Sequence, residues 1–70
     1  MIFIVEKDGT QERIEAMSFI HAENIVKNPA IQAGETVIDV KYGDQSGTSV
    51  IVTEQNGQII TRRIYLSSKS

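Results

Sequence analysis

The chain has 70 residues and a formal net charge of −2, from nine acidic and seven basic side chains. A chain this short builds one hydrophobic core, so we expect a single domain over residues 1–66 and a frayed polar tail over residues 67–70. The charge balance excludes a strong overall attraction to nucleic acid or to an anionic membrane. The sequence contains no cysteine, so disulfides cannot supplement the small core, and self-association is the expected supplement.

The apolar run over residues 1–5 stops at Glu6. It is shorter than a signal-peptide core and far shorter than the roughly 20 apolar residues that a membrane span needs. We therefore expect no targeting segment and no membrane partner. A small secreted domain usually carries disulfides, so a chain without cysteine is expected in the cytoplasm.

The first predicted element is a β-hairpin. Residues 2–7 are rich in β-branched and aromatic side chains, and Asp8-Gly9 suits a tight two-residue turn. The register that follows pairs Lys7 with Thr10, Val5 with Glu12, Phe3 with Ile14 and Met1 with Ala16. Because the first strand is apolar on both faces and the second on one, we expect the first to be interior and the second near an edge.

A helix is expected over residues 18–28. Ser18 is a good N-cap, and apolar residues follow it at three- and four-residue steps, namely Phe19, Ala22, Ile25 and Val26. The polar face would carry His21, Glu23, Asn24 and Lys27. Pro29 is expected to end the helix, because a proline disfavours helical geometry at the residue before it.

Three more strands are predicted after the helix. Residues 36–42 alternate, with Ile38, Val40 and Tyr42 on one side, and a polar loop follows over residues 43–47. Asn56-Gly57 then predicts a second hairpin, between strands over residues 48–54 and 58–66. A two-residue loop would pair Gln55 with Gln58. A three-residue loop with a bulge at Gly57 would pair Glu54 with Gln58 and gather Val50, Val52, Ile60 and Ile64 on one face, and we favour this register.

The predicted fold is α+β, ordered ββαβββ: a mainly antiparallel five-stranded curled sheet with one helix packed on one face. One helix covers only part of such a sheet. The candidates for the uncovered surface are Ile2, Ile4, Ile51, Ile59 and Tyr65.

No pattern in the chain points to catalysis. His21 is the only histidine, which disfavours a zinc site. Ser18 and His21 are neighbours in the first helical turn, but Ser18 already has a role as the cap. The glycine-containing loop at 43–48 lacks the lysine of a phosphate-binding loop and leads into a strand. We expect no catalytic, cofactor-binding or metal-binding residues, no cofactor, and a protein that is not an enzyme.

The expected function is protein binding through the uncovered sheet face or an exposed edge, with Arg62, Arg63, Tyr65 and Tyr42 as partner-binding residues, because arginine and tyrosine are enriched in interface hot spots. Arg62 and Arg63 are adjacent in a strand and should point to opposite faces. A single-stranded nucleic-acid binder that uses the same Arg/Tyr strand is the less favoured alternative. A homodimeric structural protein is another, and we expect a homodimer in either case.

This layout of a short N-terminal hairpin, one Ser-capped helix and a C-terminal antiparallel meander resembles that of some small phage-encoded inhibitors, including certain anti-CRISPR proteins. The resemblance covers the whole chain, is architectural, and carries over no functional residue. It implies an inhibitor of a host protein complex.

Overall fold

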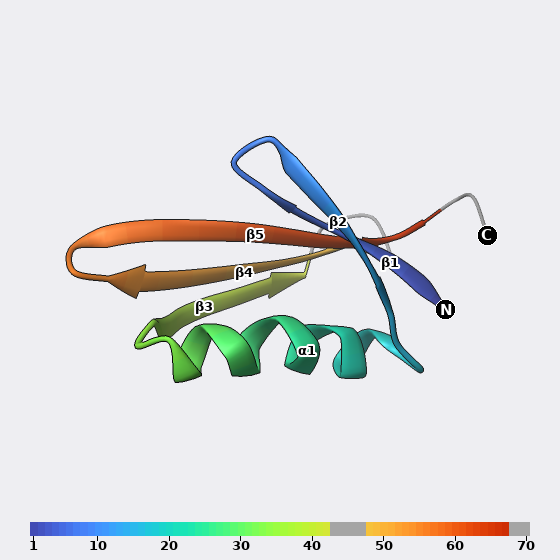
Figure 1. The fold of residues 1–70 in the computed structure, drawn as a ribbon, viewed down its shortest axis with the longest axis horizontal. Coiled ribbons are helices and arrows are strands. Elements are labelled where there is room, and N and C mark those ends of the chain that lie inside the picture. The colour runs from blue at the N-terminus through green and yellow to red at the C-terminus, as the bar shows by residue number, and fades with distance from the viewer. Residues whose placement is uncertain (43–47, 68–70) are drawn as a thin grey trace.

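The computed structural model describes residues 1–42 and 48–67, and within them the elements follow the order ββαβββ (Figure 1). The bounds are β1 Ile2–Lys7, β2 Thr10–Glu15, α1 Phe19–Gln32, β3 Thr36–Tyr42, β4 Thr48–Gln55 and β5 Gln58–Leu66. All paired strands are antiparallel, which confirms the predicted α+β fold. The predicted loop at 43–47 and residues 68–70 of the predicted tail lie outside the described residues.

The strand order in the sheet is β2-β1-β5-β4-β3. β1 is therefore interior and β2 is an edge strand, as expected, and β3 forms the other edge. The ladder between β1 and β5 runs only from Phe3 to Glu6 on β1, and beyond it the tip of the β1–β2 hairpin bends away from β5 (Figure 1). At the opposite end, the Ser67 N–H donates to the Ile2 carbonyl at 2.9 Å, so the first residue of the expected tail still lies along β1.

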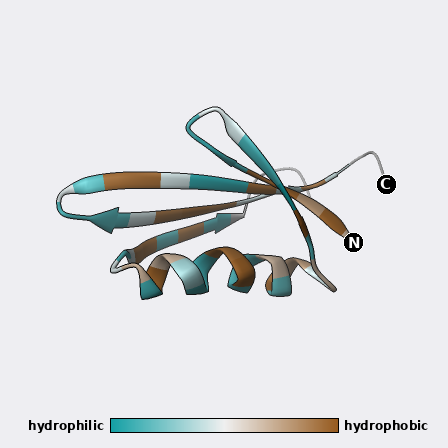
Figure 2. Ribbon diagram, viewed as in Figure 1, coloured by the Kyte–Doolittle hydropathy of each residue, from teal (hydrophilic) through white to brown (hydrophobic). Residues whose placement is uncertain are grey.

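The first hairpin has the predicted register, with Phe3 opposite Ile14 and Val5 opposite Glu12. Its two turn residues both have positive φ, +50° at Asp8 and +78° at Gly9. That conformation matches the twist of the flanking strands in a two-residue hairpin. The tip is hydrophilic, whereas the N-terminal part of β1 is hydrophobic (Figure 2).

The favoured register of the second hairpin is wrong. Gln55 pairs with Gln58 across a two-residue turn, because both Asn56 and Gly57 have positive φ (+53° and +81°) and no bulge forms. This register turns every side chain of β4 to the face opposite to the expected one. Ile51, expected on the uncovered surface, is fully buried against the helix side instead, and Val52 points away from it.

The alternation expected in β3 is confirmed from Asp39 to Tyr42 but is wrong before it, since Val37 and not Ile38 shares the side of Val40. The ladder to β4 shifts between Val37 and Asp39, where a β-bulge inserts Ile38. Val37 and Val40 consequently share the helix side, and Ile38 is 53% exposed. An extra residue in one strand reverses the alternation on one side of it, which a period-two pattern cannot reveal.

α1 begins as predicted at a Ser18 cap. The Ser18 hydroxyl accepts from the His21 N–H at 3.1 Å, and His21 Nδ1 in turn accepts from the Met17 N–H at 3.0 Å. The Ser18 hydroxyl thereby satisfies one of the unpaired N–H groups of the first helical turn. The His21 side chain binds the N–H of the residue before the cap, a reciprocal contact similar to that of a capping box.

The predicted end of the helix is wrong, because Pro29 lies inside α1. An internal proline removes one backbone hydrogen bond, but the next residue, Ala30, packs into the core side at 5% exposure, and its carbonyl accepts from the N–H groups of Ala33 and Glu35. Gly34 follows with φ +96°, and a Cβ there would lie 3.0 Å from Gln55 Nε2. Glycine therefore makes the turn from helix to β3.

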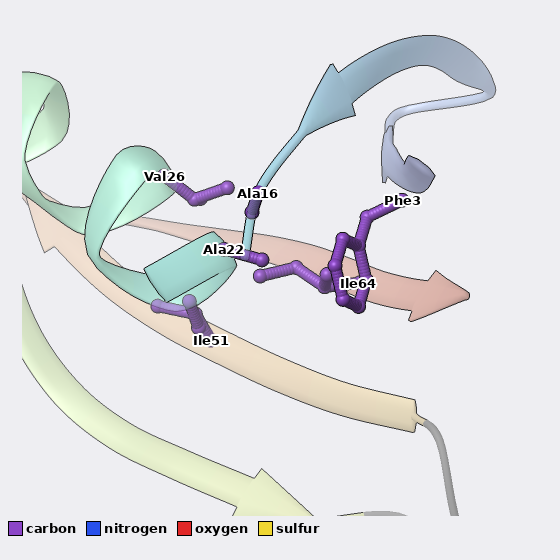
Figure 3. Close-up of a cluster of buried hydrophobic side chains, with 6 residues drawn as sticks. All are labelled: Phe3, Ala16, Ala22, Val26, Ile51 and Ile64. Atoms are coloured by element: carbon purple, nitrogen blue, oxygen red, sulfur yellow. The ribbon is translucent and has the colours of Figure 1, made fainter. Parts of the chain in front are cut away.

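The core lies between α1 and one face of the sheet (Figure 3). It gathers one or two side chains from each of β1, β4, β5, α1 and the segment before α1: Phe3, Ala16, Ala22, Val26, Ile51 and Ile64. The Phe3 and Phe19 rings meet edge to face, with centroids 4.9 Å apart and planes at 76°. This small cluster fixes which sheet face the helix covers and leaves the other face uncovered.

Candidate interaction site

The four residues predicted from the sequence do not form one site. Arg62 lies opposite Ile51, on the helix side of the sheet, and Arg63 lies opposite Val50, on the other side. The expectation that the two arginines point to opposite faces is therefore confirmed. Tyr65 shares the face of Arg63. Tyr42 is the last residue of β3, opposite Ser49, and its side chain lies outside the described part of the chain.

Arg62 is tied into an ion pair rather than presented to solvent. Its Nη1 donates to Glu35 Oε1 at 2.8 Å and its Nη2 donates to Glu35 Oε2 at 3.0 Å. The Thr53 hydroxyl donates to the same Glu35 Oε1 at 2.6 Å and accepts from Arg62 Nη1 at 3.1 Å. The side chains of Arg62 and Glu35 are only 12% and 8% exposed. Arg62 therefore stabilises the fold and is not an exposed partner-binding residue.

The same contacts determine the ionisation of Glu35. Hydrogen bonds from Arg62, and then from Thr53, lower the pKa of Glu35 from 4.5 to about 2, although burial opposes this shift. A carboxyl group with this pKa is ionised at neutral pH and holds no proton to give. Glu35 is therefore unsuited to general-acid chemistry, and the pair with Arg62 has a structural role.

Sequence reasoning missed Glu35, since nothing in the residues around Gly34 marks a buried acid. It also placed Glu23 on the exposed face of the helix, which is wrong: Glu23 is 4% exposed, and its Oε2 accepts from the Ser49 hydroxyl at 2.8 Å. Here a signal was available. Glu23 is four residues after Phe19 and three before Val26, so it lies in the apolar stripe.

A groove opens beside the Arg62–Glu35 pair, between α1 and the first hairpin. It has a volume of about 300 Å³ and is lined by Val5, Glu12, Ile14, Ile25, Val26, Pro29, Ala30, Glu35 and Arg62. A second hollow of about 470 Å³ shares Val5, Glu12 and Arg62 and reaches the hairpin tip at Asp8. This second hollow lies next to the end of the β1–β5 ladder, whose last pair is Glu6 with Arg63. The groove is therefore a consequence of the curled hairpin.

The second surface, which we call the open face, is the side of the sheet that α1 does not cover. The strand registers give its residues: Ile2, Ile4 and Glu6 on β1; Gln11, Arg13 and Glu15 on β2; Thr36, Asp39 and Lys41 on β3; Thr48, Val50, Val52 and Glu54 on β4; Ile59, Thr61, Arg63 and Tyr65 on β5. Apolar side chains follow the three middle strands, and charged side chains lie on all five strands. Ile2, Ile4, Ile59 and Tyr65 were expected on this surface and lie there.

Tyr65 lies on the open face near the end of the central strand β5, opposite Ile4. It is half-buried, and its hydroxyl accepts from Gln11 Nε2 at 3.1 Å, a group that also donates to Glu6 Oε2 at 3.1 Å. Arg63, its neighbour two residues earlier, is exposed, and its guanidinium makes no hydrogen bond or ion pair with any residue that the structure describes. The open face thus combines a held aromatic ring with an unpaired cation.

Residues 1–42 and 48–67 contain no group of three or more His, Asp or Glu side chains that could hold a metal ion. His21 lies in the first turn of α1, whereas the groove is lined by the later turns. Within the same residues, no helix is long and apolar enough to cross a membrane.

Fold and surface together define the class of this protein: a small α+β domain whose curled antiparallel sheet carries a helix on one face only. No protein-family description, curated protein or solved structure matches the chain.

Proposed function

We propose that this chain is a protein-binding module that is not an enzyme and that takes its partner on the open face. The observation that best supports this proposal is that Arg63 and Tyr65 lie beside Val50 and Ile4 on a sheet face that no described element covers. Arginine and tyrosine are enriched among the residues that dominate interface energetics. Arg62 and Tyr42, the other two residues expected in this role, are not part of the proposal.

The charge on the open face favours a protein over a nucleic acid. Three bases stand there, namely Arg13, Lys41 and Arg63. Four acids accompany them, namely Glu6, Glu15, Asp39 and Glu54. A surface that binds a phosphate backbone needs an excess of positive charge, whereas charges of both signs among apolar side chains suit a protein surface of complementary pattern.

The test compares open-face variants with matched controls on other surfaces. Tyr65→Ala and Arg63→Ala are paired with Ile31→Ala, an exposed apolar residue of α1, and Lys7→Ala, an exposed cation of the first hairpin. Immobilised wild-type chain captures proteins from the native host, and each candidate is then purified and titrated by calorimetry. We expect the open-face variants to weaken binding about tenfold or more, which corresponds to about 1.4 kcal/mol.

A partner whose affinity changes equally with Ile31→Ala or Lys7→Ala would contradict the use of the open face. A parallel titration with a labelled single-stranded oligonucleotide at physiological salt is expected to show no binding. Affinity that falls steeply with salt and is lost in Arg63→Ala would contradict a protein partner and favour the nucleic-acid alternative.

Inhibition of a host complex, the role that the resemblance to phage inhibitors implies, is the narrower form of this proposal. Its support is the architecture alone. It predicts that the captured partner belongs to a larger assembly. The activity of that assembly should fall when the wild-type chain is added and should stay unchanged when the Tyr65→Ala variant is added instead.

A further inference from the structure

The two edges of the sheet differ in how well they can accept another strand. β3 carries the bulge between Val37 and Asp39, and bulges protect an edge from pairing. β2 has an unbroken ladder to β1, with six successive residue pairs and no register shift. Its outer side is therefore the regular edge of the sheet.

The alternation of hydrogen bonds along β2 shows which backbone groups are available on that side. The Ala16 N–H donates to the Met1 carbonyl at 3.0 Å, and in an antiparallel ladder every second residue repeats this pattern. Glu12 and Ile14 therefore bond to β1. The N–H and C=O groups of Arg13 and Glu15 point outward, away from β1.

We infer that a second copy of this chain pairs with β2 through these groups, antiparallel, about a two-fold axis that passes through Ile14. In this register the backbones of Arg13 and Glu15 exchange hydrogen bonds with Glu15 and Arg13 of the second copy. The two-fold axis is perpendicular to the sheet, so opposite residues lie on the same face. Each guanidinium then stands directly opposite a carboxylate.

The charges select this register among its neighbours. With the axis at Arg13, the arginines of the two copies lie opposite each other. With the axis at Glu12 or at Glu15, two carboxylates lie opposite each other. Like charges directly opposite in a sheet are destabilising, whereas opposite charges stabilise a cross-strand pair. An axis at Gln11 provides neither a charge pair nor an apolar pair. Only the axis at Ile14 combines two opposite-charge pairs with an apolar contact.

The dimer also covers a half-buried apolar residue. Ile14 lies at the margin of the core and lines the groove, and in the pair it meets Ile14 of the second copy. The result is one ten-stranded sheet with both helices on the same side. The open faces remain uncovered, so the inference does not depend on the proposed function.

The first experiment exchanges the charges. Arg13 and Glu15 are exposed, so Arg13→Glu and Glu15→Arg leave the core unchanged. Sedimentation equilibrium from micromolar to millimolar concentration is expected to show a monomer–dimer equilibrium in the wild-type chain. Each single variant should weaken it about tenfold or more, because both symmetric pairs become like-charged, and the double variant should recover to within about threefold. A monomer at all concentrations, growth beyond a dimer, or single variants equal to wild type would overturn the inference.

The second experiment reads the register by crosslinking, which the absence of native cysteine makes simple. The Ile14 pair is not hydrogen-bonded, so its Cα atoms lie about 4.5 Å apart, within the range of a disulfide. Ile14→Cys should form an oxidised dimer at least about tenfold faster than Glu12→Cys, Arg13→Cys or the exposed control Thr61→Cys. Faster dimer formation by any of these three would overturn the register. If Ile14→Cys does not fold, the charge exchange alone decides.

Discussion

Arg62 and Glu35 meet through two hydrogen bonds, 2.8 Å from Nη1 to Oε1 and 3.0 Å from Nη2 to Oε2. This contact joins β5 to the segment between α1 and β3, which are 27 residues apart in the chain. Thr53 on β4 completes the cluster through its hydroxyl. In a domain with so small an apolar core, this polar cluster fixes how the end of α1 meets the sheet.

Replacement of Arg62 by methionine should destabilise the fold. Arg62→Met keeps much of the side-chain volume but leaves the Glu35 carboxylate nearly buried without its cation, at an expected cost of about 2 to 3 kcal/mol. Arg63→Met, at the exposed neighbouring position, should change the free energy of unfolding by less than about 0.5 kcal/mol. Urea denaturation followed by circular dichroism measures both, and equal losses would contradict a structural role confined to Arg62.

The lowered pKa of Glu35 predicts an acid-dependent loss of stability. The folded-state pKa, about 2, is below the ordinary value of 4.5, so the folded state favours the ionised form. The resulting stabilisation is present above pH 4.5 and is lost as the pH falls from there toward 2. In Glu35→Gln this contribution is absent. The difference in urea midpoint between wild type and Glu35→Gln should therefore shrink between pH 5 and pH 2.5, and a constant difference would contradict the assignment.

Truncations on β4 test the register of the second hairpin. Ile51 is fully buried on the helix side, and Val52 is half-buried on the open face. Ile51→Ala should cost about 2 to 5 kcal/mol, because it opens a cavity in the core. Val52→Ala should cost about 1 kcal/mol or less. The reverse order, measured by denaturant titration, would indicate the three-residue loop instead.

The contact between Glu23 and Ser49 predicts a non-additive pair of substitutions. Ser49→Ala removes the hydroxyl that donates to the buried Glu23 carboxyl group and should cost about 1 to 3 kcal/mol. In a Glu23→Gln background the same change should cost less, because the amide offers one oxygen acceptor in place of the two of the carboxyl group. A double-mutant cycle by thermal denaturation checks this coupling, and simple additivity would count against a direct hydrogen bond.

Local patterns in the sequence determined the elements of this fold. Asp8-Gly9 has a conformational preference that acts within four residues, so the first hairpin and its register were predictable. Ser18 caps the helix through an N–H three residues away, which is likewise local. The two-sided apolar pattern of β1 correctly indicated an interior strand, which has β2 on one side and β5 on the other.

Only the tertiary structure decided the features that depend on distant segments. Pro29 remains helical because Ala30 is buried in the packed interface, and β3 bulges at Ile38 in its ladder to β4. Asn56-Gly57 is compatible with two registers, which differ in the face of β4 that is buried. In the structure Ile51, and not Val52, is buried in the core. Arg62 was likewise expected to bind a partner, whereas in the structure it pairs with Glu35, 27 residues away in the chain. Patterns of neighbouring residues report local backbone preference, whereas burial and ion pairing depend on contacts between distant parts of the chain.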